Sequence, residues 1–216
     1  MRAAFRLEFL MHLSVIDAGL GNIKSIVRMV EHIGGTASLV SNPAHLADAE
    51  ALLLPGVGHY DYGMKLLNEG GWIAPLNEAA LGRRVPVLGI CLGMQLMCRG
   101  SEEGSTPGLG WIAADVRRID TGGDPRLKVP HIGWAATTVE RAHDILPEQE
   151  QELRYYYVHS YRMVCDDPAD VLCSADYGTR FHSGFARDNL RGVQFHPEKS
   201  HRFGMELFRR FLGLTA

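Results

Sequence analysis

Apolar and polar residues along the first half of the chain follow the spacing of strands that alternate with helices. Residues 12–17 (HLSVID) have the pattern of a strand that ends at the glycines of AGLGN. Residues 22–33 then carry apolar side chains at helical spacing until Gly34 and Gly35 end the helix. Further strands are predicted at 36–40, 51–55 and 85–90. This alternation predicts an α/β fold with a parallel sheet.

The segments between these strands have the signals of helices. In SNPAHLADA, Ser41 or Asn42 can cap a short helix whose first turn accepts Pro43. Residues 60–81 are predicted to be helical with an interruption at Gly70 and Gly71, and a further helix is predicted after Cys91. The strand VPVLGI before it is apolar throughout, which is typical of parallel strands covered on both faces.

The second half of the chain has shorter strand patterns, at 111–119, 136–140, 155–161, 170–176 and 190–195. Turn-forming stretches such as TGGDP and CDDPAD separate them, and an amphipathic helix is predicted at 202–212. We therefore expect one domain, an open, mostly parallel α/β sheet flanked by helices with an added antiparallel portion. It should span 12–216. Residues 1–11 are interpreted as a ragged leader, with Met11 as a hypothetical translation start.

Composition excludes several classes of function. The chain has 216 residues, 46% of them hydrophobic, which is enough for one sizeable core. A net charge of -3 with dispersed Lys and Arg argues against nucleic acid as a partner. No apolar run reaches the ~20 residues that span a bilayer, and no histidine spacing of the HExxH kind suggests a metal. We expect a cytoplasmic protein without membrane contact, metal or cofactor.

The four cysteines form no CxxC pair and are better interpreted as reduced thiols than as a disulfide framework. Packing accounts best for Cys98, Cys165 and Cys173. Cys91 differs because the sequence GICLG places it between two glycines, in the strand-to-helix context of a nucleophile elbow. Such a turn exposes the sulfur at the first turn of a helix, where free N–H groups favour a thiolate. The alternative is an ordinary buried cysteine.

A nucleophilic cysteine needs a base, and His196 is the strongest of the ten histidines. GVQF has the pattern of a strand that ends in His196-Pro197-Glu198, which puts two titratable groups at one strand terminus. Histidine can accept the thiol proton, and Glu198 can hold the imidazole in one tautomer. Alone, His196 would be interpreted as an ordinary strand-end histidine.

Acyl transfer also requires donors for the oxyanion. PGVG (55–58) follows a strand, and its glycines let the backbone approach a substrate closely. The amide of Leu92, next to the nucleophile, is the usual second donor. The alternative is a plain glycine turn at a strand end.

PGVG, GICLGMQ and HPEKS, in this order, resemble the triad glutamine amidotransferases of class I. With KVPHIGW, YYYVHSY and DAGLGNIKS, the chain looks like the glutaminase subunits of imidazole glycerol phosphate synthase in histidine biosynthesis, from about residue 12 to the C-terminus. The resemblance implies that Cys91 attacks the glutamine side-chain amide, His196 relays the proton and Glu198 orients it. A thioester then forms, ammonia leaves, and water releases glutamate.

The same resemblance assigns binding roles and a partner. Residues implied to hold glutamine are Gly56, Gly58, Gln95, Ser160 and Tyr161. Val57 would supply an oxyanion amide only after the PGVG loop reorganises with the partner bound. The implied partner is a (β/α)₈-barrel cyclase in a heterodimer, which receives the ammonia. The face toward it would include Asn22, Trp134, Tyr156 and Lys199.

Two residues depart from the family pattern, which has tyrosine after the first aspartate and asparagine after PHxGW. This chain has Ala18 and Ala135 at those positions. Loss of the amide at 135 leaves open a relative that feeds ammonia to a different acceptor synthase. The residues are also compatible with a free-standing hydrolase and with a non-catalytic scaffold of the same fold.

Overall fold

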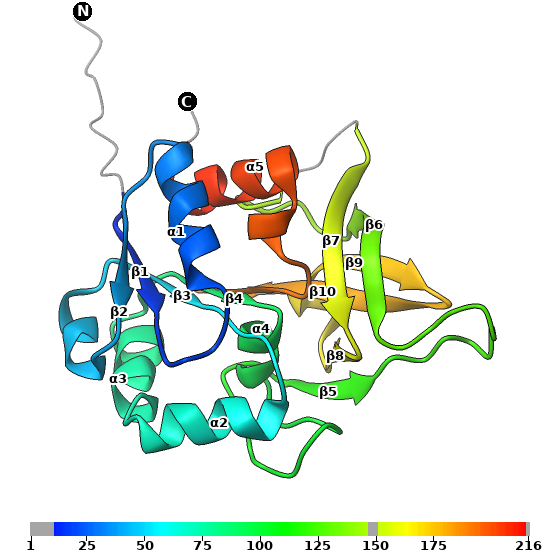
Figure 1. Cartoon of the computed structure of the whole chain (residues 1–216), viewed down its shortest axis with the longest axis horizontal. Coiled ribbons are helices and arrows are strands. Elements are labelled where there is room, and N and C mark those ends of the chain that lie inside the picture. Colours follow the sequence, from blue (N-terminus) through cyan, green and yellow to red (C-terminus); the bar gives the residue numbers. More distant parts are fainter. Residues whose placement is uncertain (1–10, 147–150, 215–216) are drawn as a thin grey trace, which may run out of the picture.

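The computed structural model describes residues 11–146 and 151–214, and it shows one mixed sheet with helices packed against it (Figure 1). The predicted leader lies outside the described residues apart from Met11. The strands are β1 (Leu13–Ile16), β2 (Ala37–Val40), β3 (Ala51–Leu54), β4 (Val87–Ile90), β5 (Ala114–Arg118), β6 (His131–Val139), β7 (Leu153–His159), β8 (Tyr161–Cys165), β9 (Val171–Tyr177), β10 (Thr179–Arg187) and β11 (Leu190–Val193). The α-helices are α1 (Ile23–His32), α2 (Tyr60–Glu69), α3 (Ile73–Asn77), α4 (Leu92–Leu96) and α5 (His201–Phe211).

The parallel part of the sheet has the strand order β2-β1-β3-β4-β11. The residues of β1, β3 and β4 are all buried, because helices cover both faces of these strands. Helices α1 and α5 lie on one side of the sheet, and α2, α3 and α4 lie on the other (Figure 1). The predicted α/β class with a parallel sheet is thus confirmed.

The antiparallel part of the sheet is larger than expected from the prediction of a mostly parallel sheet. It continues from β11 through β10, β9, β6 and β7, and β5 joins it through β8. Strand β10 was missed, because its sequence TRFHSGFAR lacks regular alternation and its register shifts at His182 and Gly184. Strand β6 begins at His131, earlier than the predicted 136, and the predicted strand at 155–161 is divided between β7 and β8.

Most helix predictions for the described residues are confirmed, with local differences. The segment after Asn42 is a 3₁₀-helix, η1 (Pro43–Asp48), whose Ala44 N–H donates to the Asn42 side chain. The predicted interruption at Gly70 and Gly71 separates α2 from α3, which continues into a π-helical turn, η2 (Glu78–Gly82). Helix α4 has only five residues, so Cys98 lies beyond it instead of on it.

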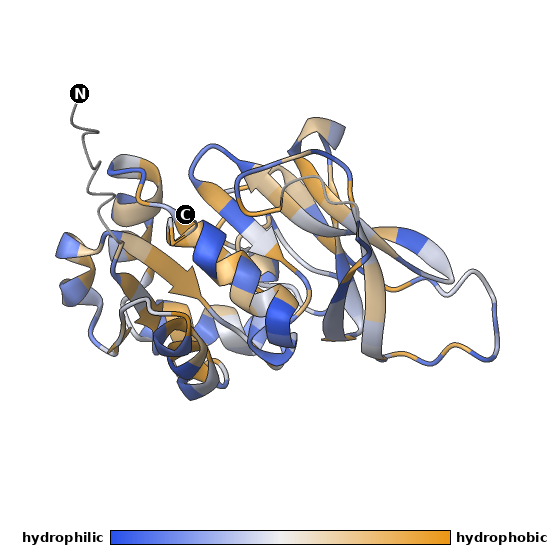
Figure 2. Ribbon diagram, turned by 90° about the horizontal axis from the view of Figure 1, so that it is seen from above, coloured by the Kyte–Doolittle hydropathy of each residue, from blue (hydrophilic) through white to orange (hydrophobic). Residues whose placement is uncertain are grey.

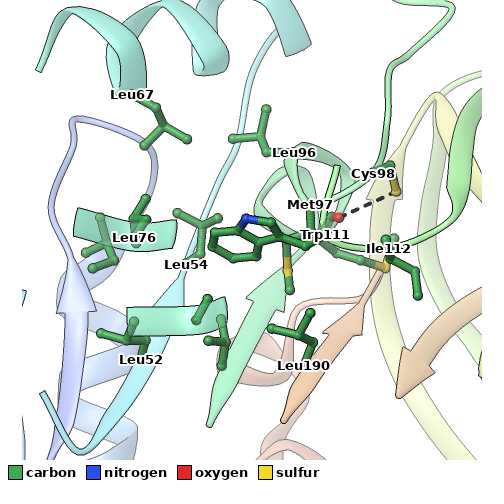
Figure 3. Packing of buried hydrophobic residues seen from close by; sticks show 14 of the residues in the cluster. Leu52, Leu54, Leu67, Leu76, Leu96, Met97, Cys98, Trp111, Ile112 and Leu190 are labelled. Carbon is green, nitrogen blue, oxygen red and sulfur yellow. Dashed lines mark hydrogen bonds between the residues drawn. The ribbon is translucent and has the colours of Figure 1, made fainter. Parts of the chain in front are cut away.

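Two hydrophobic clusters fill the two faces of the sheet. Leu52 and Leu54 belong to the cluster that contains Trp111 and Leu190 (Figure 3), whereas Leu53 belongs to the cluster beneath α1 and α5. This division follows from the two-residue period of a strand, which sends successive side chains to opposite faces. Hydrophobic and hydrophilic residues alternate around the flanking helices (Figure 2). The strands are therefore held from both sides.

The predicted packing role of the other cysteines is confirmed, since Cys98, Cys165 and Cys173 are buried free thiols. Cys98 Sγ lies 3.8 Å from the Met94 carbonyl oxygen (Figure 3). Among the helices of the described chain, none has the length and apolarity required to cross a membrane.

Replacing Leu52 by alanine should lower the free energy of unfolding by about 2–5 kcal/mol, because the fully buried side chain leaves a cavity between β3 and the helices. Leu39→Ala is the matched control, since Leu39 on β2 is 42% exposed. It should cost about 1 kcal/mol or less. Urea unfolding measures both values, and equal losses would contradict this account of the core.

Candidate active site

Cys91 lies at a sharp turn between β4 and α4. Its backbone has φ 52° and ψ −111°, a conformation that non-glycine residues rarely adopt and that costs about 1–3 kcal/mol. The Cys91 N–H donates to the Val193 carbonyl (2.8 Å), and the Cys91 carbonyl accepts from Gln95 N–H (3.2 Å). Bonds to β11 and α4 therefore hold the strained turn in place. The short α4 provides a single turn of aligned peptide dipoles behind it.

The positions around Cys91 require glycine because neighbouring atoms leave no room for a Cβ. A Cβ on Gly89 would lie 2.6 Å from the Met97 sulfur, and one on Gly93 would lie 1.9 Å from the Leu54 carbonyl oxygen. A Cβ on Gly56 would lie 2.7 Å from the Gly93 backbone nitrogen. Backbone of β3, the PGVG loop and α4 therefore meet at distances that allow no side chain.

His196 and Glu198 form a buried pair beside this turn. The distance from His196 Nδ1 to Glu198 Oε1 is 2.8 Å, and both side chains are almost fully buried. Glu198 lies in a 3₁₀-helix, η4 (Pro197–Lys199), which brings the carboxylate back toward the imidazole. The His196 N–H donates to the Tyr156 carbonyl (2.9 Å) and thereby ties η4 to β7.

The surroundings of His196 favour its charged form. Burial lowers the pKa of the imidazole, but its interactions with the Cys91 thiol and with Glu198 outweigh burial and raise the pKa to about 9. Nε2, the nitrogen not bonded to Glu198, is buried and has no regular hydrogen-bond partner within the described chain. It is available to exchange a proton with the neighbouring thiol.

A cavity of about 390 Å³ opens at Cys91. The other sequence-predicted residues that line it are Val57, Gly58, Leu92, Gln95, Ser160, Tyr161 and Lys199. The predicted Gly56 does not line the cavity and instead packs against Leu92 and Gly93. The cavity is therefore lined by three parts of the chain that are distant in sequence, within residues 57–58, 91–95 and 158–161.

One of the two predicted oxyanion donors, the Leu92 amide, already makes a hydrogen bond in this structure. The N–H of Leu92 donates to the carbonyl oxygen of Gly56 at 3.3 Å. Val57, whose peptide bond contains that carbonyl, is 47% exposed at the cavity. The PGVG loop therefore blocks the Leu92 donor with one of its own acceptors.

Three of the predicted partner-face residues form a cluster. The rings of Trp134 and Tyr156 lie 6.2 Å apart, and the Lys199 ammonium lies 5.8 Å from the centre of the Tyr156 ring. Trp134 is 40% exposed and its neighbour Ile132 is 59% exposed. Asn22 is exposed on a different element, at the N-cap of α1.

Sequence reasoning missed two residues that the fold brings to the site, Gln194 behind Cys91 and Glu103 at the cavity. Gln194 is fully buried, and its Nε2 lies 3.6 Å from Cys91 Sγ. Its signal was a single polar residue in an apolar run just before HPE. Glu103 lines the cavity, and its Oε2 accepts the first N–H of α2, from Tyr60 (2.9 Å). No pattern in the sequence marks Glu103.

A pair of histidines, also missed, includes one residue that lines the cavity, His159. His131 Nδ1 and His159 Nε2 are 3.1 Å apart, and His159 Nδ1 donates to the Tyr161 carbonyl at 2.8 Å. Burial lowers the pKa of His131 to about 4 and that of His159 to about 3, so both rings are neutral near pH 7. Across residues 11–146 and 151–214, no three His, Cys, Asp or Glu side chains gather in a metal-binding arrangement.

Comparison with known proteins identifies relatives over nearly the full chain. The family model described as glutamine amidotransferase class-I matches residues 14–213. The chain is 46% identical over 201 residues to imidazole glycerol phosphate synthase subunit HisH 2 of Pseudomonas aeruginosa, a match covering 93% of this chain and 98% of that protein. It is 42% identical over 205 residues to subunit HisH of Salinibacter ruber, covering 93% and 94%.

Solved structures share the fold at low sequence identity. PurLQS of Thermotoga maritima superimposes with a TM-score of 0.72 at 19% identity, covering 94% of this chain and 98% of that one. The glutaminase domain of Trypanosoma brucei CTPS, solved with bound acivicin, gives a TM-score of 0.64 at 14% identity and covers 93% of each chain. These likenesses concern the fold alone.

Imidazole NMR should show His196 titrating near pH 9. Because its pKa is raised in the folded state, this group stabilises the fold below about pH 6.5, and that contribution is lost as pH rises through about 9. Glu198→Gln should lower the midpoint by roughly 1–2 units, since the opposite charge is removed. His131 and His159, with pKa values near 4 and 3, should not titrate from pH 6 to 10. If the titration midpoint of His196 were the same in the wild type and in Glu198→Gln, the result would contradict the pairing.

Proposed function

The chain belongs to the class-I glutamine amidotransferase family, and we propose that it is the glutamine-hydrolysing subunit of an imidazole glycerol phosphate synthase, with Cys91, His196 and Glu198 as its triad. The observation that carries the proposal is the placement of Cys91 at a cavity with the buried His196–Glu198 pair beside it. The near-full-length identity to synthase subunits supports histidine biosynthesis as the pathway.

The geometry supports a two-step hydrolysis. His196 Nε2 takes the Cys91 proton, and the thiolate adds to the side-chain amide carbon of glutamine. The resulting imidazolium, held by Glu198 at Nδ1, then protonates the leaving nitrogen as the C–N bond breaks. Ammonia departs and a thioester remains. Water adds to the thioester with His196 as the base, the C–S bond breaks, and glutamate leaves with Cys91 restored.

The oxyanion donors would become available through one peptide rotation. Gly56 C=O and Val57 N–H belong to the same planar peptide and point in opposite directions. Turning this peptide over would free the Leu92 N–H and place the Val57 N–H where the Gly56 oxygen now lies. The rotation changes ψ of Gly56 and φ of Val57, and Gly56 can accept the new angle because it has no side chain. Loss of such a donor typically costs about 2.7–4 kcal/mol of transition-state stabilisation.

The polar groups of the cavity suit a zwitterionic amino acid. Glu103 is the acidic residue of the lining and Lys199 the basic one. Both N–H bonds of the Gln95 amide are used, toward the Tyr161 carbonyl (3.2 Å) and Gln194 (3.0 Å), so Gln95 offers its oxygen as an acceptor. We assign Glu103 and Gln95 to the substrate α-ammonium, with Gly58, Ser160 and Tyr161 beside the rest of the substrate backbone. Gly56 does not line the cavity, and its proposed role is to shape the PGVG loop.

A synthase subunit implies a cyclase partner. We infer that this partner is a (β/α)₈ barrel in a heterodimer and docks on the cluster of Trp134, Tyr156 and Lys199, beside the cavity. Ala135 and Ala18, the departures from the family pattern, pack against the hydrophobic clusters. The four free thiols suit a reducing cytoplasm, which we propose as the location.

Replacing Cys91 by alanine should reduce glutamine-dependent product formation by at least about a thousandfold, because no nucleophile remains. Ammonia-dependent synthesis by the partner should persist. Cys98→Ala is the control, since this buried thiol does not line the cavity. Product formation is assayed in the reconstituted complex with glutamine or with ammonium salt. Loss of both activities in Cys91→Ala would contradict the division of labour.

Glu103→Gln should raise KM for glutamine roughly tenfold or more while kcat changes little, since a charged contact to the α-ammonium is lost and the bond to Tyr60 N–H can be kept. Glu102→Gln is the matched control. The Glu102 carboxylate binds Arg117 and the Arg118 amide instead of lining the cavity. Steady-state kinetics of the complex distinguish them, and an unchanged KM in Glu103→Gln would remove Glu103 from the binding site.

A further inference from the structure

We propose that Gln194 is a positioning residue that donates a hydrogen bond to Cys91 Sγ and holds the sulfur as a thiolate at the cavity. The proposal deepens the proposed function and rests on Cys91 being its nucleophile. The Gln194 carboxamide is fully buried and joins two groups of the site. Its Nε2 lies 3.6 Å from Cys91 Sγ, and its Oε1 lies 3.0 Å from Gln95 Nε2.

The direction of these hydrogen bonds is set by a backbone carbonyl. The Tyr161 oxygen can only accept, so the Gln95 atom that faces it must be the NH₂ group. The same NH₂ faces Gln194, so Gln194 must present its oxygen there. The other end of the Gln194 amide, which faces Cys91, is therefore the NH₂ group. Cys91 Sγ therefore accepts a hydrogen bond from Gln194.

A donor at this place discriminates between the two forms of the cysteine. The neutral thiol has a second contact, a long one of 3.8 Å from Sγ to the Val158 carbonyl, in which sulfur is the donor. Ionisation removes that contact, whereas the Gln194 contact strengthens because its acceptor becomes charged. Gln194 thus favours the thiolate over the thiol.

Gln194 acts alongside the titratable groups around the sulfur. His196, the N-cap of η4, interacts with Cys91 and has Glu198 behind it, and Lys199 of η4 lines the cavity. His159 on β7 and Glu103 in the loop after α4 also line the cavity. The imidazole of His196 supplies a proton acceptor, but a fixed neutral donor restricts where the sulfur lies. The two contributions are separable by mutation.

The test is the pH dependence of Cys91 alkylation by iodoacetamide in the full chain. Gln194→Met keeps the side-chain length and removes the donor, and Gln194→Glu keeps the acceptor for Gln95 but replaces the NH₂ by oxygen. Both should move the midpoint of the alkylation rate upward by about one to two pH units. Ser183→Ala is the matched control. It removes an equally buried contact to sulfur, from Ser183 Oγ to Cys173 Sγ (3.4 Å), and should leave the midpoint unchanged.

Peptide mapping assigns the reacting thiol, with Cys91→Ala as the reference. A midpoint that stays at the wild-type value in either folded variant overturns the proposal, even if glutamine turnover falls. A wild type that hydrolyses no glutamine with its partner would overturn the proposed function, yet the alkylation comparison would still decide the role of Gln194. Circular dichroism establishes which variants fold.

A wild-type measurement covers the case in which neither variant folds. With ¹⁵N-labelled glutamine, the Gln194 side-chain NH₂ signals should shift downfield through the same midpoint as the alkylation rate, because the hydrogen bond strengthens when the sulfur ionises. Signals that stay constant through that midpoint would overturn the proposal.

Discussion

The close approach of three backbone segments at Gly93 is the constraint on which the site depends. The Leu54 carbonyl at the end of β3, the PGVG loop and the start of α4 are packed so tightly that Gly56 and Gly93 have no room for a Cβ. This contact fixes the turn that holds Cys91 at a positive φ. Hydrogen bonds from β11 and α4 then stabilise it. The framework of the sheet thus sets the direction of the Cys91 side chain, the proposed nucleophile.

The antiparallel part of the sheet supplies what that framework lacks. The end of β7, the start of β8 and Ser160 between them form part of the cavity wall, through residues 158–161. The Tyr161 carbonyl receives hydrogen bonds from both Gln95 and His159, so one backbone oxygen orients groups on two sides of the cavity. The mixed sheet therefore places the Cys91 turn of its parallel half and the lining residues 158–161 of its antiparallel half around one cavity.

The sequence predicted the parts of the site whose chemistry is local. The glycines around Cys91 have a fixed spacing, and His196 and Glu198 are two positions apart. Both features can be recognised in the sequence because they involve residues that are close together along the chain. Glu103 and Gln194 could not be assigned this way, because their contacts are distant in sequence. Glu103 contacts Tyr60, 43 positions away, and Gln194 contacts Cys91, 103 positions away. Strand β10 was missed for a related reason, because its irregular register is stabilised by β9 and β11 rather than by its own pattern.

The neutral pair of His131 and His159 has a consequence for proton traffic. Both rings stay uncharged over the physiological range, although His159 lines the same cavity as Cys91. In the proposed mechanism, a proton released by Cys91 therefore goes to His196, because the lowered pKa makes the His159 ring a poor proton acceptor. The same proton would then be at hand for the leaving nitrogen, instead of being held on the His159 side of the cavity.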